Sequence, residues 1–142
     1  MFNFFCRDKK KNNYFGLEPH EQKRLSALLR YSPTETKVFG VPVFINDACT
    51  LLGDVRDILN KEIYKFQTKT SSPLIVDCGA NIGMSVVYFK RQYPNATVLA
   101  FEPDPTLFAM LSKNILNFSF DNVELRHQAV WINDQGVDFR TE

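Results

Sequence analysis

The sequence has little cysteine and no long apolar run. Its three cysteines, Cys6, Cys49 and Cys78, are scattered, and no two have the Cys-x-x-Cys spacing of a zinc or redox motif. We therefore expect reduced thiols, no disulfide framework and no metal site. No stretch approaches the ~20 apolar residues of a membrane-spanning helix, and the apolar N-terminal part is too short for a secretion signal. These absences predict a cytoplasmic protein without membrane insertion.

An excess of charge of one sign is also lacking. The 17 lysines and arginines are nearly balanced by 16 aspartates and glutamates, which leaves a formal net charge of +1. Because nucleic-acid-binding domains usually carry a basic excess, we expect no nucleic acid as a partner. Apolar residues make up 44% of the 142 residues, enough for the core of one domain of ordinary size. The oligomeric state stays open.

Residues 1–70 predict a lead-in segment of helices and a short β element. Its expected parts are a poorly ordered start over 1–17, a helix over 19–31, a turn over 32–35, a β-rich run over 37–45 and a helix over 48–66. Both helices rest on apolar residues that recur at helical spacing. Within the β-rich run, Gly40 and Pro42 favour an edge strand or a bent hairpin over a central strand.

From residue 71 onward, short apolar runs alternate with helical patterns. The expected elements are strands over 74–78, 97–101 and 123–132, helices over 82–92 and from Pro105, and a further strand that begins at 137. The run LIVDC at 74–78 is typical of a parallel strand buried on both faces, and we expect Cys78 and Trp131 in the core. The order β-α-β-α-β with short connections predicts right-handed crossovers and a parallel sheet.

The first of these strands ends in an acid and a glycine turn, in IVDCGANIG at 75–83. Gly79 and Gly83 allow the backbone to pass close to a ligand, and free N–H groups at the helix start would face that ligand. The spacing is not the dinucleotide fingerprint Gly-x-Gly-x-x-Gly, because Asn81 stands where a central glycine would be needed. Asp77 would repel a pyrophosphate and attract an ammonium group.

The second strand ends in FEPDP at 101–105. Its acid, Glu102, would lie at the tip of the neighbouring strand, where a carboxylate can accept two hydrogen bonds from a ribose diol. A ligand that carries an amino-acid end for Asp77 and a ribose for Glu102 is S-adenosylmethionine.

Four motifs together resemble the FkbM-type methyltransferases. They are VDCGANIG at 76–83, AFEPDP at 100–105, the set Lys113, Asn114 and Asn117, and NVELRHQAV at 122–130. These enzymes are class I, Rossmann-like and dependent on S-adenosylmethionine, and typically methylate oxygens of sugars and natural-product scaffolds. The resemblance is strong over 73–142 and weaker over 38–66. It implies a doubly wound α/β sheet of which residues 71–142 form the first β-α-β-α-β half.

The resemblance also implies a cofactor site. Its residues are Asp77, Gly79, Ala80, Asn81 and Gly83 at the methionine end, Glu102 at the ribose, Pro103 and Asp104 at the rim near adenine, and Gln128 and Ala129 against adenine. The implied function is O-methylation of a small-molecule or glycan acceptor. The acceptor and the catalytic base stay open, and no catalytic residue is assigned.

Because class I methyltransferases have a larger sheet, the chain is expected to be a fragment. Its first strand would form an exposed apolar edge, and the chain would fold poorly or bind cofactor weakly without the remainder. Two alternatives stay open. One is a non-catalytic cofactor-binding fragment or degenerate paralogue. The other, less favoured, is an NAD-dependent oxidoreductase, which would need the dinucleotide fingerprint.

Overall fold

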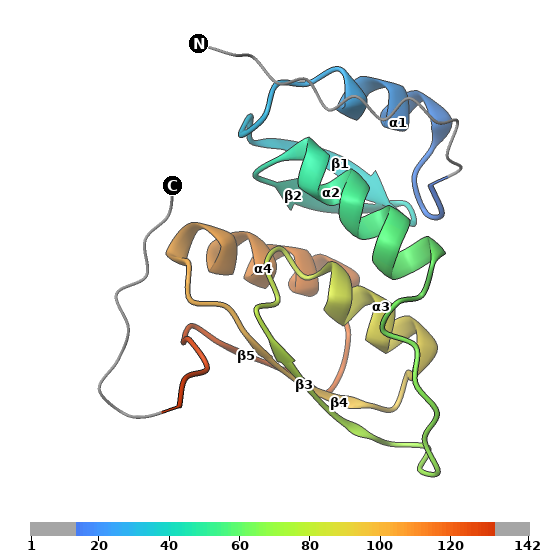
Figure 1. Cartoon of the computed structure of the whole chain (residues 1–142), viewed down its shortest axis with the longest axis vertical. Helices are drawn as coiled ribbons and strands as arrows, with labels where there is room; N and C mark the ends of the chain where they lie inside the picture. Colours follow the sequence, from blue (N-terminus) through green and yellow to red (C-terminus); the bar gives the residue numbers. More distant parts are fainter. Residues whose placement is uncertain (1–13, 133–142) are drawn as a thin grey trace. The chain divides into compact units, whose positions relative to one another are not determined.

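The computed structural model describes residues 14–132, and the chain divides into two compact units, the first ending at Lys65 and the second beginning at Phe66 (Figure 1). The first unit contains α1 (Pro19–Ser26), β1 (Thr34–Val38), β2 (Val41–Ile45), α2 (Ala48–Asp54) and the π-helical segment η1 (Val55–Asn60). The second contains β3 (Leu74–Cys78), α3 (Met84–Gln92), β4 (Thr97–Phe101), α4 (Pro105–Phe118) and β5 (Val123–Arg126). The strand predicted from 137 lies outside the described residues.

In the first unit, β1 and β2 form an antiparallel hairpin, which confirms the predicted bent hairpin. Phe39 and Gly40 connect the strands with φ values of +53° and +80°, the backbone conformation that matches the twist of a tight hairpin. The predicted turn over 32–35 is wrong at its end, because β1 already begins at Thr34. The unit has a closed apolar core, in which Leu25, Val38, Val43, Ile45, Leu51 and Val55 are fully buried.

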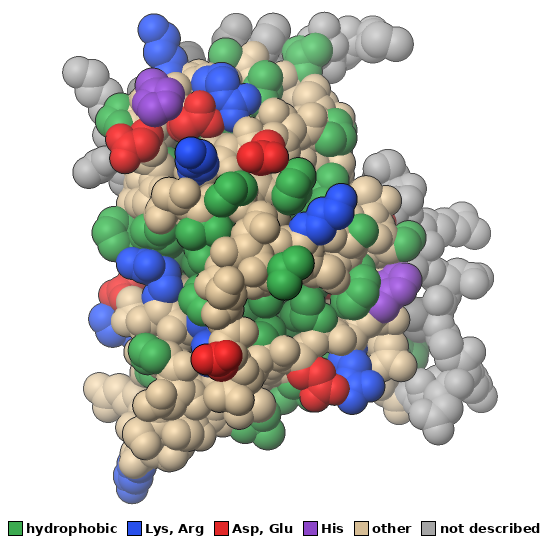
Figure 2. All heavy atoms as spheres, turned by 180° about the vertical axis from the view of Figure 1, so that it is seen from behind, with side chains coloured by type: hydrophobic (Ala, Val, Ile, Leu, Met, Phe, Trp, Pro, Cys, Tyr) green, Lys and Arg blue, Asp and Glu red, His purple; other side chains and the backbone are tan. Residues whose placement is uncertain are grey.

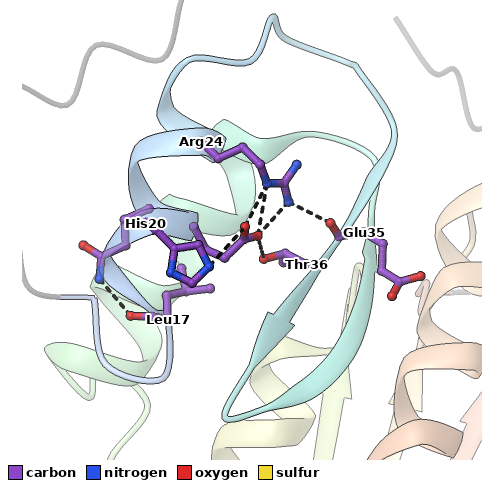
Figure 3. A network of polar contacts seen from close by, with 7 residues as sticks. Leu17, His20, Arg24, Glu35 and Thr36 are labelled. Carbon is purple, nitrogen blue, oxygen red and sulfur yellow. Dashed lines mark hydrogen bonds and ion pairs between the residues drawn. The ribbon is translucent and has the colours of Figure 1, made fainter.

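A polar network fastens α1 to the hairpin, as Figure 3 shows. The guanidinium of Arg24 donates to the Glu21 carboxylate and to the Glu35 backbone oxygen, the latter at 2.8 Å. The Thr36 hydroxyl donates to the same Glu21 carboxylate at 2.7 Å. Hydrogen bonds from Arg24 and then Thr36 lower the pKa of Glu21 to about 2, so this acid stays ionised and the network persists at neutral pH.

Helix α1 is shorter than predicted, since it ends at Ser26 and not at residue 31. Asp47, which caps the start of α2, also binds the segment that follows α1. It accepts a hydrogen bond from the Arg30 side chain at 2.7 Å and one from the Tyr31 N–H at 3.4 Å. These tertiary bonds, together with a φ of +56° at Tyr31, draw the segment out of the helical path.

Two further predictions for the first half need correction. The helix predicted over 48–66 ends at Asn60, because Glu62 takes a left-handed φ of +51° that no helix can continue through. Ile63, an apolar residue within the predicted helix, lies beyond its actual end and is 56% exposed. Within the start predicted to be poorly ordered, Tyr14 and Leu17 are buried.

The second unit contains a parallel sheet with the order β3-β4-β5, which confirms the predicted Rossmann-like β-α-β-α-β arrangement. Helices α3 and α4 both lie on one side of this sheet (Figure 1), as right-handed crossovers between successive neighbours require. Ile75, Val98 and Ala100 are buried on the helix-covered side. The register places Asp77 beside Ala100 and Cys78 beside Phe101, so the two strands end level with each other.

The opposite face of the sheet is open in the described part of the chain. Leu74 and Val76 are 70% and 54% exposed there, and Cys78 is exposed too. The predictions of burial on both faces of this strand and of a core position for Cys78 are therefore wrong, because both helices cover one face only. Between residues 14 and 132, β3 pairs with β4 alone and forms the predicted edge.

The third strand is shorter than predicted, ending at Arg126 and not at residue 132. Its hydrogen-bonding partner, β4, ends at Phe101, which stands beside Arg126 in the ladder. Within the described residues, the ladder between the two strands ends at this pair. Trp131, predicted in the core, lies beyond this end and is 58% exposed.

Three features of the described surface bear on partners. None of the helices between residues 14 and 132 is long and apolar enough to cross a lipid bilayer. On the face drawn in Figure 2, acidic and basic side chains are interspersed. The same described residues contain no group of three or more His, Cys, Asp or Glu side chains suited to a metal ion.

The packing of α4 on the glycine turn makes a stability prediction. Gly83 has a φ of +100°, and a Cβ there would lie 2.9 Å from Leu111 Cδ1 and 3.2 Å from Ile115 Cδ1. Gly79 has a similar φ of +99° but open space around it. Both alanine substitutions incur roughly 1–2 kcal/mol of left-handed strain, and Gly83→Ala adds about 1–3 kcal/mol of overpacking. In urea unfolding, Gly83→Ala should have a lower free energy of unfolding than Gly79→Ala. Equal losses of unfolding free energy in the two variants would contradict the packing account.

Candidate cofactor site

The carboxyl ends of β3 and β4 bring two acids to one edge of the sheet. Asp77 is the penultimate residue of β3, and Glu102 follows β4 directly. Because the strands are adjacent and in level register, both side chains belong to the same end of the sheet. That edge is where open parallel sheets bind their ligands. Asp77 is half-buried, and Glu102 is only 4% exposed.

Asp77 is held by a hydrogen bond that the sequence did not reveal. The hydroxyl of Ser85, buried in the first turn of α3, donates to Asp77 Oδ2 at 2.5 Å. Burial raises the pKa of Asp77, the Ser85 bond opposes that rise, and the charge of Glu102 adds to it. Within residues 14–132, no lysine or arginine forms an ion pair with either carboxylate. Two acids kept together without a basic partner favour a cationic ligand.

The glycine turn between β3 and α3 uses most of its N–H groups internally. The N–H groups of Gly79 and Ala80 both donate to the Phe101 backbone oxygen, at 2.9 and 2.8 Å. The Asn81 N–H donates to Glu102 Oε2 at 2.8 Å, and the Gly83 N–H donates to the Ala80 oxygen at 2.8 Å. Of these groups only Gly83 belongs to the predicted helix start, and its N–H is bonded within the turn. These four N–H groups are therefore not available as donors to a phosphate.

Helix α4 supports the far end of the same turn. Asn114, fully buried on this helix, donates its Nδ2–H to the Ile82 backbone oxygen at 2.9 Å. Leu111 and Ile115, four positions apart on one face of the same helix, occupy the space that a Cβ on Gly83 would need. An amide within an otherwise apolar helical stripe is the sequence signal that indicates this role for Asn114.

The β4–α4 connection holds the predicted rim residues. Asp104 is the N-cap of α4, and its Oδ1 accepts the N–H groups of Thr106 and Leu107 at 2.8 and 2.9 Å. Its own N–H donates to Glu102 Oε1 at 2.9 Å. The Pro103 backbone oxygen lies 3.1 Å from His127 Nε2. Asp104 therefore shapes this rim through its backbone and its cap, while its carboxylate is engaged by the helix.

The two residues predicted to contact adenine, Gln128 and Ala129, lie just past the end of β5 and are exposed. Their neighbour His127 stacks on the Phe108 ring with centroids 4.9 Å apart and contacts the Pro103 oxygen. Gln128 and Ala129 therefore directly follow a residue, His127, that contacts the rim. Their contact with adenine stays a prediction.

Comparison with known proteins gives related sequences and related folds. No family model matches the chain. Methyltransferase sdnD of Sordaria araneosa is 43% identical over 70 residues, which cover 49% of this chain and 27% of that protein. The 31-O-demethyl-FK506 methyltransferase FkbM of Streptomyces tacrolimicus is 46% identical over 41 residues, covering 29% and 16%. The chain spans about a quarter or less of the length of these relatives.

Among solved structures, M. jannaschii TYW2 in complex with AdoMet aligns with a TM-score of 0.51 and 19% identity, covering 68% of this chain and 43% of that chain. A Pyrococcus horikoshii protein, crystallised as a candidate transferase, aligns with a TM-score of 0.50 and 21% identity, covering 72% and 38%. At such low identity, these structures share the Rossmann-like fold with this chain.

The raised pKa of Asp77 makes stability depend on pH. An aspartate whose pKa lies above the ordinary 3.8 in the folded state favours folding only while it is protonated. Its contribution is complete below that ordinary value and is lost as pH rises through the raised pKa. Asp77→Asn should therefore increase the free energy of unfolding at pH 7 and leave it unchanged near pH 3. Ser85→Ala should lower stability at pH 7, because it removes the donor that offsets burial.

Urea unfolding across pH 3–8 measures both effects, with Glu124→Gln as a matched control. Glu124 is exposed on β5 and pairs with Arg126. Its replacement by glutamine should therefore change the free energy of unfolding only slightly. An Asp77→Asn variant that is less stable than the unmodified chain at pH 7 would refute this electrostatic account.

Proposed function

We propose that this chain, which resembles the FkbM-type methyltransferases in sequence and shares the Rossmann-like fold, holds the S-adenosylmethionine site of a methyltransferase. One observation carries the proposal. Two carboxylates, Asp77 and Glu102, lie at the carboxyl ends of neighbouring parallel strands without a basic partner in the described residues. An edge of the sheet with two carboxylates, beside a turn whose N–H groups are largely bonded already, fits a ligand with a cationic end and a diol.

Asp77 receives the ammonium group of the methionine end. Its carboxylate is kept in place by Ser85, and burial strengthens its attraction for a positive charge. Gly79, Ala80, Asn81 and Gly83 form the turn beside it, where the absence of large side chains lets a ligand approach the backbone. The turn is fixed by its own hydrogen bonds, so the site needs little rearrangement.

Glu102 receives the ribose. A carboxylate has about four acceptor positions, and backbone N–H groups take one on each oxygen of Glu102. The remaining positions accept the two ribose hydroxyls. Pro103 and Asp104 form the rim near adenine, and Gln128 and Ala129 contact the base from the end of β5.

When bound, S-adenosylmethionine supplies an electrophilic methyl group. The residues of this chain bind and orient it, and the acceptor is a hydroxyl of a sugar or natural product. The name of the Streptomyces relative describes methylation at an oxygen of FK506, which supports an O-methylation. Catalysis would rest on positioning and electrostatics. No residue between 14 and 132 is assigned as the base.

The competing assignment, an NAD-dependent oxidoreductase, finds less support. A pyrophosphate needs free N–H groups at the turn, and those of Gly79, Ala80, Asn81 and Gly83 already donate within the protein. Asp77 at the strand end would also repel it.

Calorimetry with the purified chain tests the proposal. We expect S-adenosylmethionine to bind and NAD not to bind. Asp77→Asn should weaken binding on the order of 10- to 100-fold, because a hydrogen bond to a charged group is lost. Glu124→Gln, the matched carboxylate-to-amide control, should leave the affinity unchanged. Binding of NAD alone would refute the proposal. Cofactor binding by a chain that transfers no methyl group to any hydroxyl acceptor would reduce it to a binding module.

A further inference from the structure

We infer that Glu102 is a positioning residue that locks the glycine turn to the start of α4, so that the methionine and ribose ends of the cofactor are recognised through one carboxylate. This inference rests on the proposed function for its ligand, but the lock itself is a property of the protein alone. It predicts that loss of Glu102 disturbs residues that never contact a ribose.

The geometry of Glu102 carries the inference. Its Oε2 accepts the Asn81 N–H at 2.8 Å, and its Oε1 accepts the Asp104 N–H at 2.9 Å. The two oxygens therefore bind two different loops, one before α3 and one before α4. The side chain is 4% exposed, and hydrogen bonds to an ionised acceptor are stronger than neutral ones.

The glycine turn needs such support because its backbone is unusual. Gly79, Asn81 and Gly83 all have positive φ, at +99°, +50° and +100°. Asparagine adopts the left-handed conformation more readily than most residues with a side chain, but still at a cost relative to glycine, so support from the surroundings favours it at Asn81. The N–H of Asn81 is held by Glu102, so the bond acts at the strained residue.

The other supports of the turn do not replace this bond. Gly79 and Ala80 are held by the backbone oxygen of Phe101, and Ile82 is held by Asn114 of α4. Glu102 thus holds the middle of the turn, between two anchors that its substitution leaves in place. Its removal should loosen the turn locally without unfolding the sheet.

Glu102→Gln is the sharpest variant, because glutamine has the same shape but only one acceptor oxygen. Its NH₂ group cannot accept from a backbone N–H, so at most one of the two loops remains bonded. Glu102→Asp retains the charge and shortens the side chain, so that it too cannot reach both loops. Glu124→Gln makes the same chemical change on an exposed strand residue.

Amide hydrogen exchange of the ligand-free chain, read residue by residue by NMR, tests the lock. In the unmodified chain, the N–H groups of Asn81 and Asp104 should be protected. Glu102→Gln should speed exchange at one or both by roughly 10-fold or more, while the Ile75 and Val98 amides within the sheet and the Glu124→Gln control keep their rates. Rapid exchange of Asn81 and Asp104 in the unmodified chain, or unchanged rates in Glu102→Gln and Glu102→Asp, would overturn the inference.

Two ligand fragments separate the lock from the ribose contact. Methylthioadenosine carries the ribose, whereas L-methionine carries none. The lock predicts that Glu102→Gln weakens both, and a loss confined to methylthioadenosine would overturn it. If exchange responds as expected but neither fragment nor S-adenosylmethionine binds the unmodified chain, the lock stands and the proposed function fails. If the ligands bind the unmodified chain but Glu102→Gln leaves the exchange rates unchanged, the lock fails and the proposed function stands.

Discussion

The level pairing of β3 with β4 is the constraint on which the site depends. It sets Asp77 beside Ala100 and Cys78 beside Phe101, so that both strands stop together and their acids meet at one edge. The Phe101 oxygen can then bind Gly79 and Ala80, and the next residue, Glu102, can reach Asn81. A shift of one residue would turn Asp77 to the open face of the sheet and separate the turn from its supports.

The site opposes stability, because it gathers like charges in a half-buried place. Burial and Glu102 both raise the pKa of Asp77, and Ser85 only partly offsets them. The protein tolerates this arrangement because strong supports surround it, from the cap of α4 by Asp104 to the hydrogen bond from Asn114 to the Ile82 oxygen. A cationic ligand would relieve the repulsion, so binding and stability would be linked.

The sequence predicted those parts of the second unit that depend on local pattern. The strand over 97–101 and the start of α4 at Pro105 are as predicted, because an apolar run and a helix-starting proline act locally. The overlong third strand and the misplaced Cys78 depend on partner length and on which face the helices cover. The bonds from Ser85 to Asp77 and from Asn114 to Ile82 join residues 8 and 32 positions apart, and only the folded chain brings them together.

The central claim is that Asp77 recognises an ammonium group. It is tested most directly by comparing S-adenosylhomocysteine with an analogue that lacks only the amino group, each titrated into the unmodified chain and into Asp77→Asn. We predict that removing the amino group weakens binding to the unmodified chain on the order of 10-fold or more and has little effect in Asp77→Asn. An equal loss in both proteins would contradict the claim, because the ammonium would then be recognised elsewhere.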